Sequence, residues 1–363
     1  VAIGYILLKK KWYDVLAGFL KAVIGYQILL VGSGGLVTAF RPVLVGLEAR
    51  FNLSAMVIDP YFGQNAVQAG MEASNAPEFI AGRSFSSVML LLLFAFILNI
   101  VLVAFKKQTK LRAIFTTGHV QVQQAATAFW LILFCFPQLN DVTILAVMTV
   151  LLGLYWAVGS NLCIGPTQDL TDGAGLTVAH QQMFGVYCAS KASEWLAKHS
   201  KKESKRIEDI ELPGFLKIFN ENLVATAILM TAFFGVILAV LGQDFLLENK
   251  FMKPGQDFFF YIMTTSFQFA VYLSILQLGV RTFVTELTNS FQGISNKLLK
   301  GSVPGVDCAV TYGFGSPNAV TLGFLMGAAG QFLAIAALLL LKSPVVVIAG
   351  FVPLFFDNAT IGV

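Results

Sequence analysis

The residues best suited to bind a small polar ligand form three short clusters in an otherwise apolar sequence. In the first cluster, His119 and Gln123 stand four residues apart inside the polar block 116–124. Side chains with this spacing share one face of a helix, so both can donate hydrogen bonds to one hydroxylated or anionic ligand. They could instead cross-link neighbouring helices. We favour ligand binding, because an ionisable group in a membrane-like segment usually has a function.

The second and third clusters lie in segments rich in glycine and proline. His180 and Gln181 belong to segment 165–183, which predicts a turn followed by the start of a helix. The positive end of that helix dipole can face an anion. Asp307 lies in segment 302–318, where its carboxylate could accept hydrogen bonds from ligand hydroxyls, orient a histidine, or satisfy backbone donors of a turn. The sequence leaves these three roles open.

Two further residues suggest chemistry less strongly. Tyr61 offers an aromatic wall with a hydroxyl, although a lone tyrosine near a membrane interface is more often an anchor. Cys308 has no activating cation beside it in the sequence, so we expect a small buried hydrophobic residue rather than a nucleophile. The four cysteines lack paired or metal-type spacing, and no His-Glu-x-x-His motif is present. We therefore expect no disulfide framework, metal, cofactor or catalytic residue.

The composition indicates that membrane helices must position these clusters. Hydrophobic residues make up 56% of the chain and charged residues only 12%. A membrane span needs about 20 mostly apolar residues. Runs of roughly that length or longer occur at 15–40, 84–105, 142–163, 223–241, 258–280 and 320–341. These runs lack the alternation of barrel strands, so the sequence predicts an all-α, polytopic transmembrane bundle.

Four stretches between the spans are too polar for lipid and too apolar for ordinary loops. They are 59–81, 116–124, 165–183 and 302–318. Interrupted helices of this kind are where transporters bind their substrates, so we expect re-entrant, discontinuous segments there. We also expect segment 281–301, whose apolar residues recur every three or four positions, to form a helix along the membrane interface.

The placement of charge predicts the orientation of the chain in the membrane. The basic loops 106–112 and 191–206 are separated by two spans and should both lie in the cytoplasm, whereas loop 242–257 should be external. We expect residues 1–363 to form one membrane domain without a soluble domain. Because the chain begins at Val1 and stops at Val363 beside apolar stretches, we expect it to be cropped at both ends.

Ordered motifs run through the chain from its first residues to its last. They are GYILL at 4–8, TGHVQVQQ at 117–124, PTQ at 166–168, TDG at 171–173, HQQ at 180–182, GVR at 279–281 with Glu286, DCA at 307–309 and NATIGV at 358–363. With these motifs the chain resembles, over essentially its whole length, the ascorbate-specific IIC permeases of the bacterial phosphoenolpyruvate-dependent phosphotransferase system.

This resemblance implies group translocation across the bacterial inner membrane. L-ascorbate would bind from outside and receive a phosphoryl group on release inside. The phosphoryl donor belongs to a IIB protein that is charged through a IIA protein, so Cys308 needs no catalytic role. The family is homodimeric in the lipid bilayer and has no nucleic-acid partner. The substrate-binding residues that the resemblance implies are Tyr61, His119, Gln123, His180, Gln181 and Asp307.

Two other function classes remain open from the residues alone. A proton-coupled secondary transporter would use the same histidines and Asp307 as a relay and would deliver an unmodified sugar acid. A membrane metalloenzyme would require His119, His180 and an aspartate to converge on one ion. We rank the metalloenzyme last, because the sequence contains no established metal motif.

Overall fold

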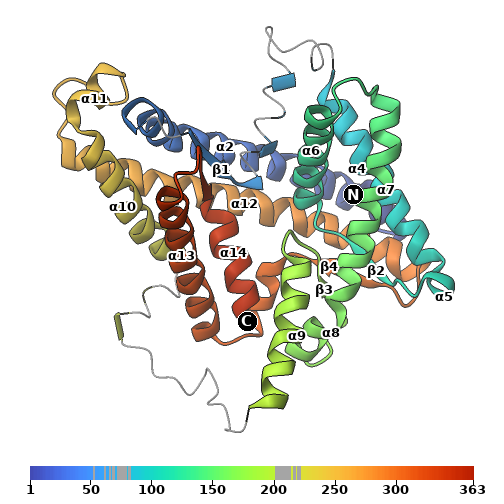
Figure 1. Cartoon of the computed structure of the whole chain (residues 1–363). Coiled ribbons are helices and arrows are strands. Elements are labelled where there is room, and N and C mark those ends of the chain that lie inside the picture. The colour runs from blue at the N-terminus through green and yellow to red at the C-terminus, as the bar shows by residue number, and fades with distance from the viewer. Residues whose placement is uncertain are drawn as a thin grey trace.

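Helices dominate the computed structural model, which describes residues 1–51, 54–60, 63–64, 67, 70–71, 80, 83–200, 214–215, 218 and 222–363 (Figure 1). The longer helices are α2 (Trp12–Phe51), α4 (Phe85–Ala104), α6 (Gly118–Cys135), α7 (Asp141–Leu162), α9 (Met183–His199), α10 (Asn222–Leu241), α12 (Phe258–Leu298), α13 (Pro317–Leu340) and α14 (Phe351–Gly362). The short ones are α1 (Ala2–Leu7), α5 (Lys106–Thr109), α8 (Ile164–Leu170), α11 (Gln243–Glu248) and the 3₁₀ helix η3 (Cys308–Gly313).

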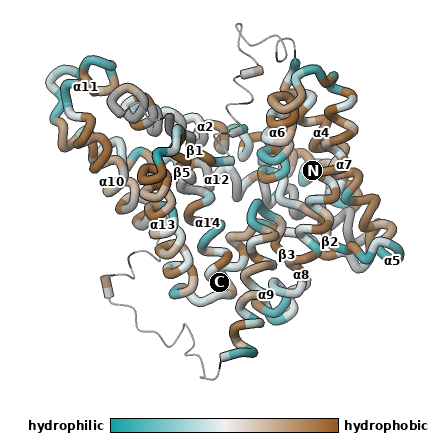
Figure 2. Tube along the Cα trace, viewed as in Figure 1, coloured by the Kyte–Doolittle hydropathy of each residue, from teal (hydrophilic) through white to brown (hydrophobic). Residues whose placement is uncertain are grey.

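The helices confirm an all-α polytopic membrane protein. Among the described residues, four stretches are long and apolar enough to cross a membrane: Trp12–Gly32, Phe85–Ala104, Asp141–Leu170 and Asn318–Leu340. Shorter apolar helices, Met230–Leu241 and Phe258–Tyr272, fall inside two other predicted spans. Figure 2 shows hydrophobic residues along α4, α7 and α13, and hydrophilic ones at α5 and α11.

Side-chain caps fix where three of the apolar helices begin. The hydroxyl of Ser84 accepts a hydrogen bond from the Ser86 amide at the start of α4, and Ser316 does the same for Asn318 at α13. The side chain of Asn140 accepts from the Thr143 amide at the start of α7. Each cap satisfies an amide that the helix leaves without an internal partner.

Segment 281–301, which we expected to be a helix along the membrane interface, is helical but continues the preceding span without a break. Helix α12 is continuous over 41 residues from Phe258 to Leu298. It contains no proline, and a helix of this length spans about 60 Å, twice the hydrocarbon core of a bilayer. It packs along α2, and the approach is close at Gly25, where an added Cβ would lie 2.7 Å from the Phe283 amide nitrogen.

The helices surround two large hydrophobic cores, and a third, small cluster consists of Val103, Ile114 and Leu299. The first core joins α2, α10, α11, α12, α13 and α14, and the second joins α4, α6, α7, strand β2 (Ala113–Phe115) and the start of α9. Phe356 of α14 packs against both, so the two cores meet at this helix. The largest fully buried aromatic residues are Phe234, Phe269 and Phe324 in the first core and Phe115, Phe129 and Trp156 in the second.

Short parallel strands occur, four of them within or directly before the polar interruptions, which the expectation of an all-helical chain did not include. Strand β1 (Ser54–Ile58) pairs with β5 (Val345–Ala349). A second sheet has the order β2-β4-β3, with β2 (Ala113–Phe115) and β3 (Thr177–Val178) on either side of β4 (Val303–Val306). These strands satisfy the backbone groups of non-helical segments inside the protein, as a membrane environment requires.

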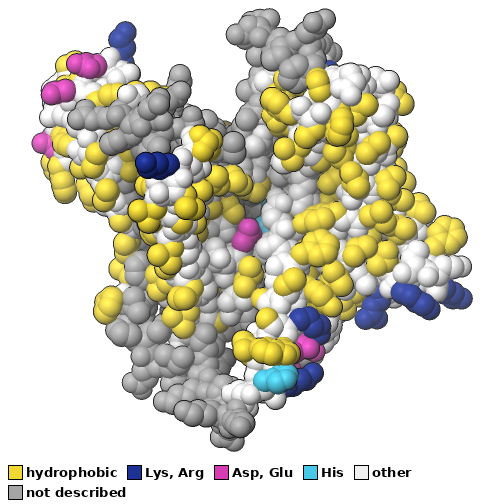
Figure 3. Space-filling view, in the orientation of Figure 1, with side chains coloured by type: hydrophobic (Ala, Val, Ile, Leu, Met, Phe, Trp, Pro, Cys, Tyr) yellow, Lys and Arg dark blue, Asp and Glu magenta, His cyan; other side chains and the backbone are white. Residues whose placement is uncertain are grey.

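Charged side chains gather at the ends of the helices. On the face shown in Figure 3, mainly Lys and Arg side chains lie over α5 and the far end of α9, whereas acidic and basic side chains lie together over α11 at the opposite end. The basic residues at α5 and α9 and the mixed charges at α11 therefore lie at opposite ends of the molecule. The placement of loops 106–112 and 242–257 on opposite sides of a membrane stays a prediction.

A buried carboxylate ties α1 to the pair of long helices. Glu286 of α12 is only 6% exposed, accepts a hydrogen bond from the Tyr5 hydroxyl, and lies 3.7 Å from the Lys21 ammonium. Removing it in Glu286→Ala leaves a buried hydroxyl without this acceptor, a loss of about 1–3 kcal/mol. We therefore expect a lower melting temperature for the purified protein.

Two further variants serve as controls for this melting-temperature measurement. Glu286→Gln keeps a carbonyl acceptor for Tyr5 and should fall between the wild type and Glu286→Ala. Glu194→Ala removes a carboxylate from an exposed pair with Lys191 and should melt like the wild type, since surface ion pairs contribute little. Equal melting of Glu286→Ala and Glu194→Ala would contradict the anchoring role of Glu286.

Candidate functional site

The β2-β4-β3 sheet positions three of the candidate residues. His119 follows β2 and lies in the first turn of α6, His180 follows β3 by two residues, and Asp307 follows β4 directly. The register pairs Phe115 with Gly305 and Val178 with Val306. In a parallel sheet the carboxyl ends of the strands lie at one edge, which brings the three side chains together.

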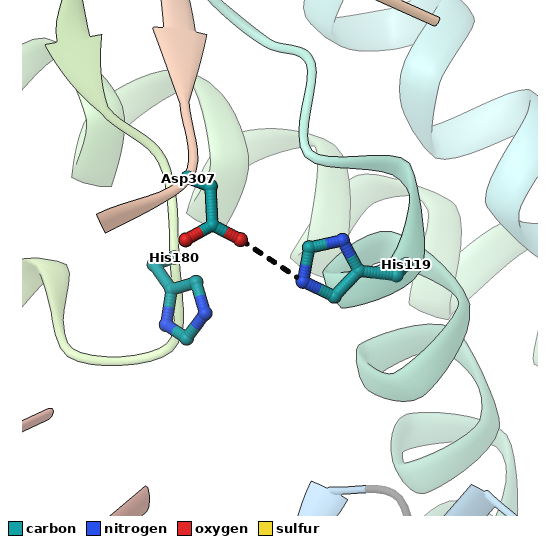
Figure 4. Close-up of side chains that lie close together, drawn as sticks. All are labelled: His119, His180 and Asp307. Atoms are coloured by element: carbon teal, nitrogen blue, oxygen red, sulfur yellow. Dashed lines mark ion pairs between the residues drawn. The ribbon is translucent and has the colours of Figure 1, made fainter. Parts of the chain in front are cut away.

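The three side chains form one compact cluster (Figure 4). The Nε2 atom of His119 lies 3.2 Å from Oδ2 of Asp307, and the ring centroids of His119 and His180 are 6.2 Å apart. The side chain of His119 is 3% exposed and that of Asp307 is 18% exposed. The histidine pair is therefore largely buried, and the carboxylate remains partly open.

Asp307 combines two of the roles that the sequence left open. Its Oδ1 accepts a hydrogen bond of 2.9 Å from the Ala309 amide and so caps η3, while its Oδ2 faces His119. It therefore satisfies a backbone donor and orients a histidine. The neighbouring Cys308 is fully buried, as predicted for a small hydrophobic residue.

A chain of glutamines extends the cluster along α6. The amide of Gln181 donates to Oε1 of Gln123 at 3.1 Å, and the amide of Gln124 donates to Oε1 of Gln181 at 2.7 Å. The hydroxyl of Tyr155 donates to the Gln181 carbonyl at 2.9 Å, and the Trp156 indole donates to Gln124. These bonds hold the turn before α9 against α6, so both predicted glutamines also link structural elements.

Several buried polar atoms in this region have no hydrogen-bond partner within the described part of the chain. They are Nδ1 of His119, Nε2 of Gln123, Nε2 of Gln182 and Oγ1 of Thr117. A buried polar group without a partner costs about 1–3 kcal/mol, so native proteins rarely retain one without a reason. Four such atoms, on residues that belong to the cluster or lie next to it in the sequence, are typical of a site that a polar ligand completes.

The structure brings together five of the six predicted site residues: His119, Gln123, His180, Gln181 and Asp307. Tyr61 lies outside the described residues. Sequence reasoning missed Asp357 of α14, whose Oδ1 lies 3.7 Å from Nδ1 of His180. The signal was available, because Asp357 is the one ionisable side chain in the apolar run 345–363. Gln182, whose Oε1 lies 2.6 Å from the same Nδ1, was also missed as a site residue.

The cluster also meets the geometric condition that we set for a metal centre. One ligand atom from each of His119, His180 and Asp307 lies within 4.8 Å of the others. Two imidazoles and a carboxylate are a donor set that divalent transition metals accept. The arrangement can thus either bind a hydroxylated anion by hydrogen bonds or gather a cation.

Comparisons with known proteins indicate the family to which the chain belongs. All 363 residues match the model of the family described as PTS system sugar-specific permease component. The chain is 34% identical over 396 aligned residues to a protein of Mycoplasma pneumoniae named ascorbate-specific PTS system EIIC component. The alignment covers 99% of this chain and 59% of that relative, so the chain spans about three-fifths of the relative's length. The chain belongs to the family of sugar-specific permease components of phosphotransferase systems.

Proposed function

We propose that this chain binds L-ascorbate and carries it inward across the bacterial cytoplasmic membrane, coupled to phosphorylation by a IIB protein that a IIA protein supplies. The observation that carries the proposal is the convergence of His119, His180 and Asp307, with unpartnered buried polar atoms beside them, in a chain of this family. The name of the Mycoplasma relative supports ascorbate as the sugar acid.

The side chains of the site include both hydrogen-bond donors and hydrogen-bond acceptors, and the two kinds bind different parts of the ligand. Ascorbate is an anion with several hydroxyl groups. The amide of Gln123 donates to its charged ring. His119 and His180 do the same as imidazolium ions, because one ring N–H of each faces Asp307 or Gln182 and the second N–H is left for the ligand, while Asp307 accepts from a hydroxyl. Hydrogen bonds to charged groups contribute about 1.5–3 kcal/mol each, so a few of them suffice for specific binding. The phosphoryl transfer itself takes place on the IIB partner.

The proposal places residues 1–363 in one permease domain surrounded by lipid and by a second copy of the chain. Large apolar side chains on the outer surface of α13 support contact with lipid or another helix. Met326 and Leu333 are each 71% exposed and Leu340 is 83% exposed. Cross-linking in native membranes, followed by mass measurement of the product, tests the homodimer directly.

The decisive experiment follows the chemical state of the transported molecule. Membrane vesicles that contain the protein are supplied with phosphoenolpyruvate, the soluble phosphotransferase proteins and radiolabelled ascorbate. We expect the label to appear inside as a phosphorylated product. Unmodified ascorbate, accumulated in response to a proton gradient, would instead favour the secondary transporter.

A second arm of this experiment addresses the metal-centre alternative that the geometry of the cluster raises. Ascorbate binding by the purified protein is measured before and after dialysis against a chelator. We expect the affinity to stay the same, because the proposed contacts are hydrogen bonds. A loss of binding that is restored by one divalent metal would favour a metal centre at His119, His180 and Asp307.

The exposed basic residues at α5 and α9 are a candidate docking surface for the IIB protein. Reversing charge in the triple variant Lys107→Glu, Arg112→Glu, Lys198→Glu is expected to slow phosphorylation-coupled uptake severalfold without changing ascorbate affinity, because surface charge mainly steers association. Initial uptake rates in vesicles at low and high salt measure the effect.

The matched control reverses charge at the opposite end of the molecule, in Lys250→Glu with Lys253→Glu next to α11. This variant should take up ascorbate at the wild-type rate. If the triple variant also takes up ascorbate at the wild-type rate, with both variants inserted in the wild-type orientation, the basic loops only set topology.

A further inference from the structure

The two hydrophobic cores meet at α14, and an acidic side chain lies at that boundary. Phe356 packs against both cores, and Asp357 is the next residue of the same helix. Figure 3 shows an acidic and a histidine side chain deep in the hollow between the two halves of the molecule. Asp357, on a helix of the first core, thus lies beside His180, which belongs to the part of the chain around the second core.

Neighbouring contacts hold α14 in place beside the cluster. The hydroxyl of Tyr312 donates to the Phe356 carbonyl at 2.9 Å and lies 3.2 Å from the hydroxyl of Thr360. Tyr312 belongs to η3, the helix that Asp307 caps. The position of Asp357 is therefore linked to that of Asp307 through a short, hydrogen-bonded path.

The carboxylate of Asp357 is available to a ligand. Its Oδ1 is 3.7 Å from Nδ1 of His180, beyond hydrogen-bonding distance, and that nitrogen already has Oε1 of Gln182 at 2.6 Å. Among the residues that the structure describes, none donates a hydrogen bond to this carboxylate, and its side chain is 24% exposed. A carboxylate accepts several hydrogen bonds, so this one retains that capacity.

We propose that Asp357 binds a hydroxyl on the side chain of the sugar acid, an assignment that rests on the proposed function. A carboxylate repels the anionic ring of such a ligand, so its partner must be a neutral hydroxyl away from that ring. The imidazoles and glutamine amides take the charged ring, and the two carboxylates, Asp307 and Asp357, take hydroxyl groups. The site therefore selects a compound that is anionic at one end and hydroxylated at the other.

The test combines a residue change with a ligand change. Affinities for ascorbate and for its 5-deoxy and 6-deoxy analogues are measured by calorimetry on the full-length protein in lipid nanodiscs. We expect Asp357→Asn to weaken ascorbate binding about tenfold, because an acceptor loses its charge. We also expect the wild type to bind at least one deoxy analogue more weakly than ascorbate, and this difference to disappear in Asp357→Asn.

The controls separate ligand contact from folding. Asp169→Asn makes the same chemical change at an exposed position of α8 and should bind like the wild type. If Asp357→Asn does not fold, Asp357→Glu serves instead, since it keeps the charge but moves it by one methylene and should also lose the discrimination. Unchanged ascorbate affinity, or weaker binding with the discrimination intact, would overturn the assignment while leaving the proposed function standing. Failure of the wild type to bind ascorbate would overturn the proposed function and the assignment together.

Discussion

Replacing His119 or His180 by alanine is expected to weaken ascorbate binding about ten- to a hundredfold while the protein stays folded. Each imidazole lies in the cluster around Asp307, and each can make a charge-assisted hydrogen bond to an anionic ligand. Such a bond contributes about 1.5–3 kcal/mol, and each 1.4 kcal/mol corresponds to a tenfold change in affinity. Titration calorimetry with ascorbate measures the loss for each variant.

The third histidine of the chain is a natural control for this experiment. His199 is exposed at the end of α9, where the centroid of its ring lies 4.6 Å from that of Trp195. His199→Ala should bind ascorbate with wild-type affinity. If His119→Ala and His180→Ala also bind with near-normal affinity, neither histidine is a ligand-binding residue.

Placing a methyl group on Gly305 is expected to weaken ascorbate binding at least a hundredfold, because it disrupts the sheet that carries the site. A Cβ at Gly305 would lie 2.6 Å from Cβ of Ala179 and 2.9 Å from the carbonyl oxygen of Ile114, so the strands on both sides would have to move. The Gly305 carbonyl also accepts a hydrogen bond of 2.9 Å from the Thr116 amide. In Gly305→Ala we expect at least a hundredfold loss of ascorbate affinity and a lower melting temperature.

Gly313 provides the matched control, since an added Cβ there meets nothing within 4 Å. Gly313→Ala should therefore bind and melt like the wild type. The two variants make the same chemical change eight residues apart. If they bind ascorbate equally well, the close packing of the three strands does not determine the geometry of the site.

The sequence predicted those features that depend on local pattern. Apolar runs of about 20 residues located helices such as α4 and α7, and the spacing of four residues placed His119 and Gln123 on one helix. The Gly- and Pro-rich interruptions marked the segments that carry His180 and Asp307. Each of these features is determined within a window of a few turns.

The features that the sequence did not reveal depend on contacts between distant segments. The pairing of β2 with β4 joins residues nearly two hundred positions apart, and strands of three or four residues leave no clear periodicity. Asp357 can be recognised as a site residue only when α14 is known to lie beside His180. The unbroken length of α12 was missed because a change of composition after Val280 resembled a helix end, although nothing there breaks the backbone.

The order of strands in the β2-β4-β3 sheet determines when the site can form as the chain is made. The central strand is the last of the three to be synthesised, so its two neighbours have no pairing partner until it emerges. About 125 residues separate β3 from β4, and at roughly 5–20 residues per second their translation takes about 6–25 s. During that interval the histidines are already present but lack their carboxylate, and closing such a long loop adds an entropic barrier. Assembly of the site is therefore a late step in biogenesis, and the half-made protein must shelter these polar side chains until then.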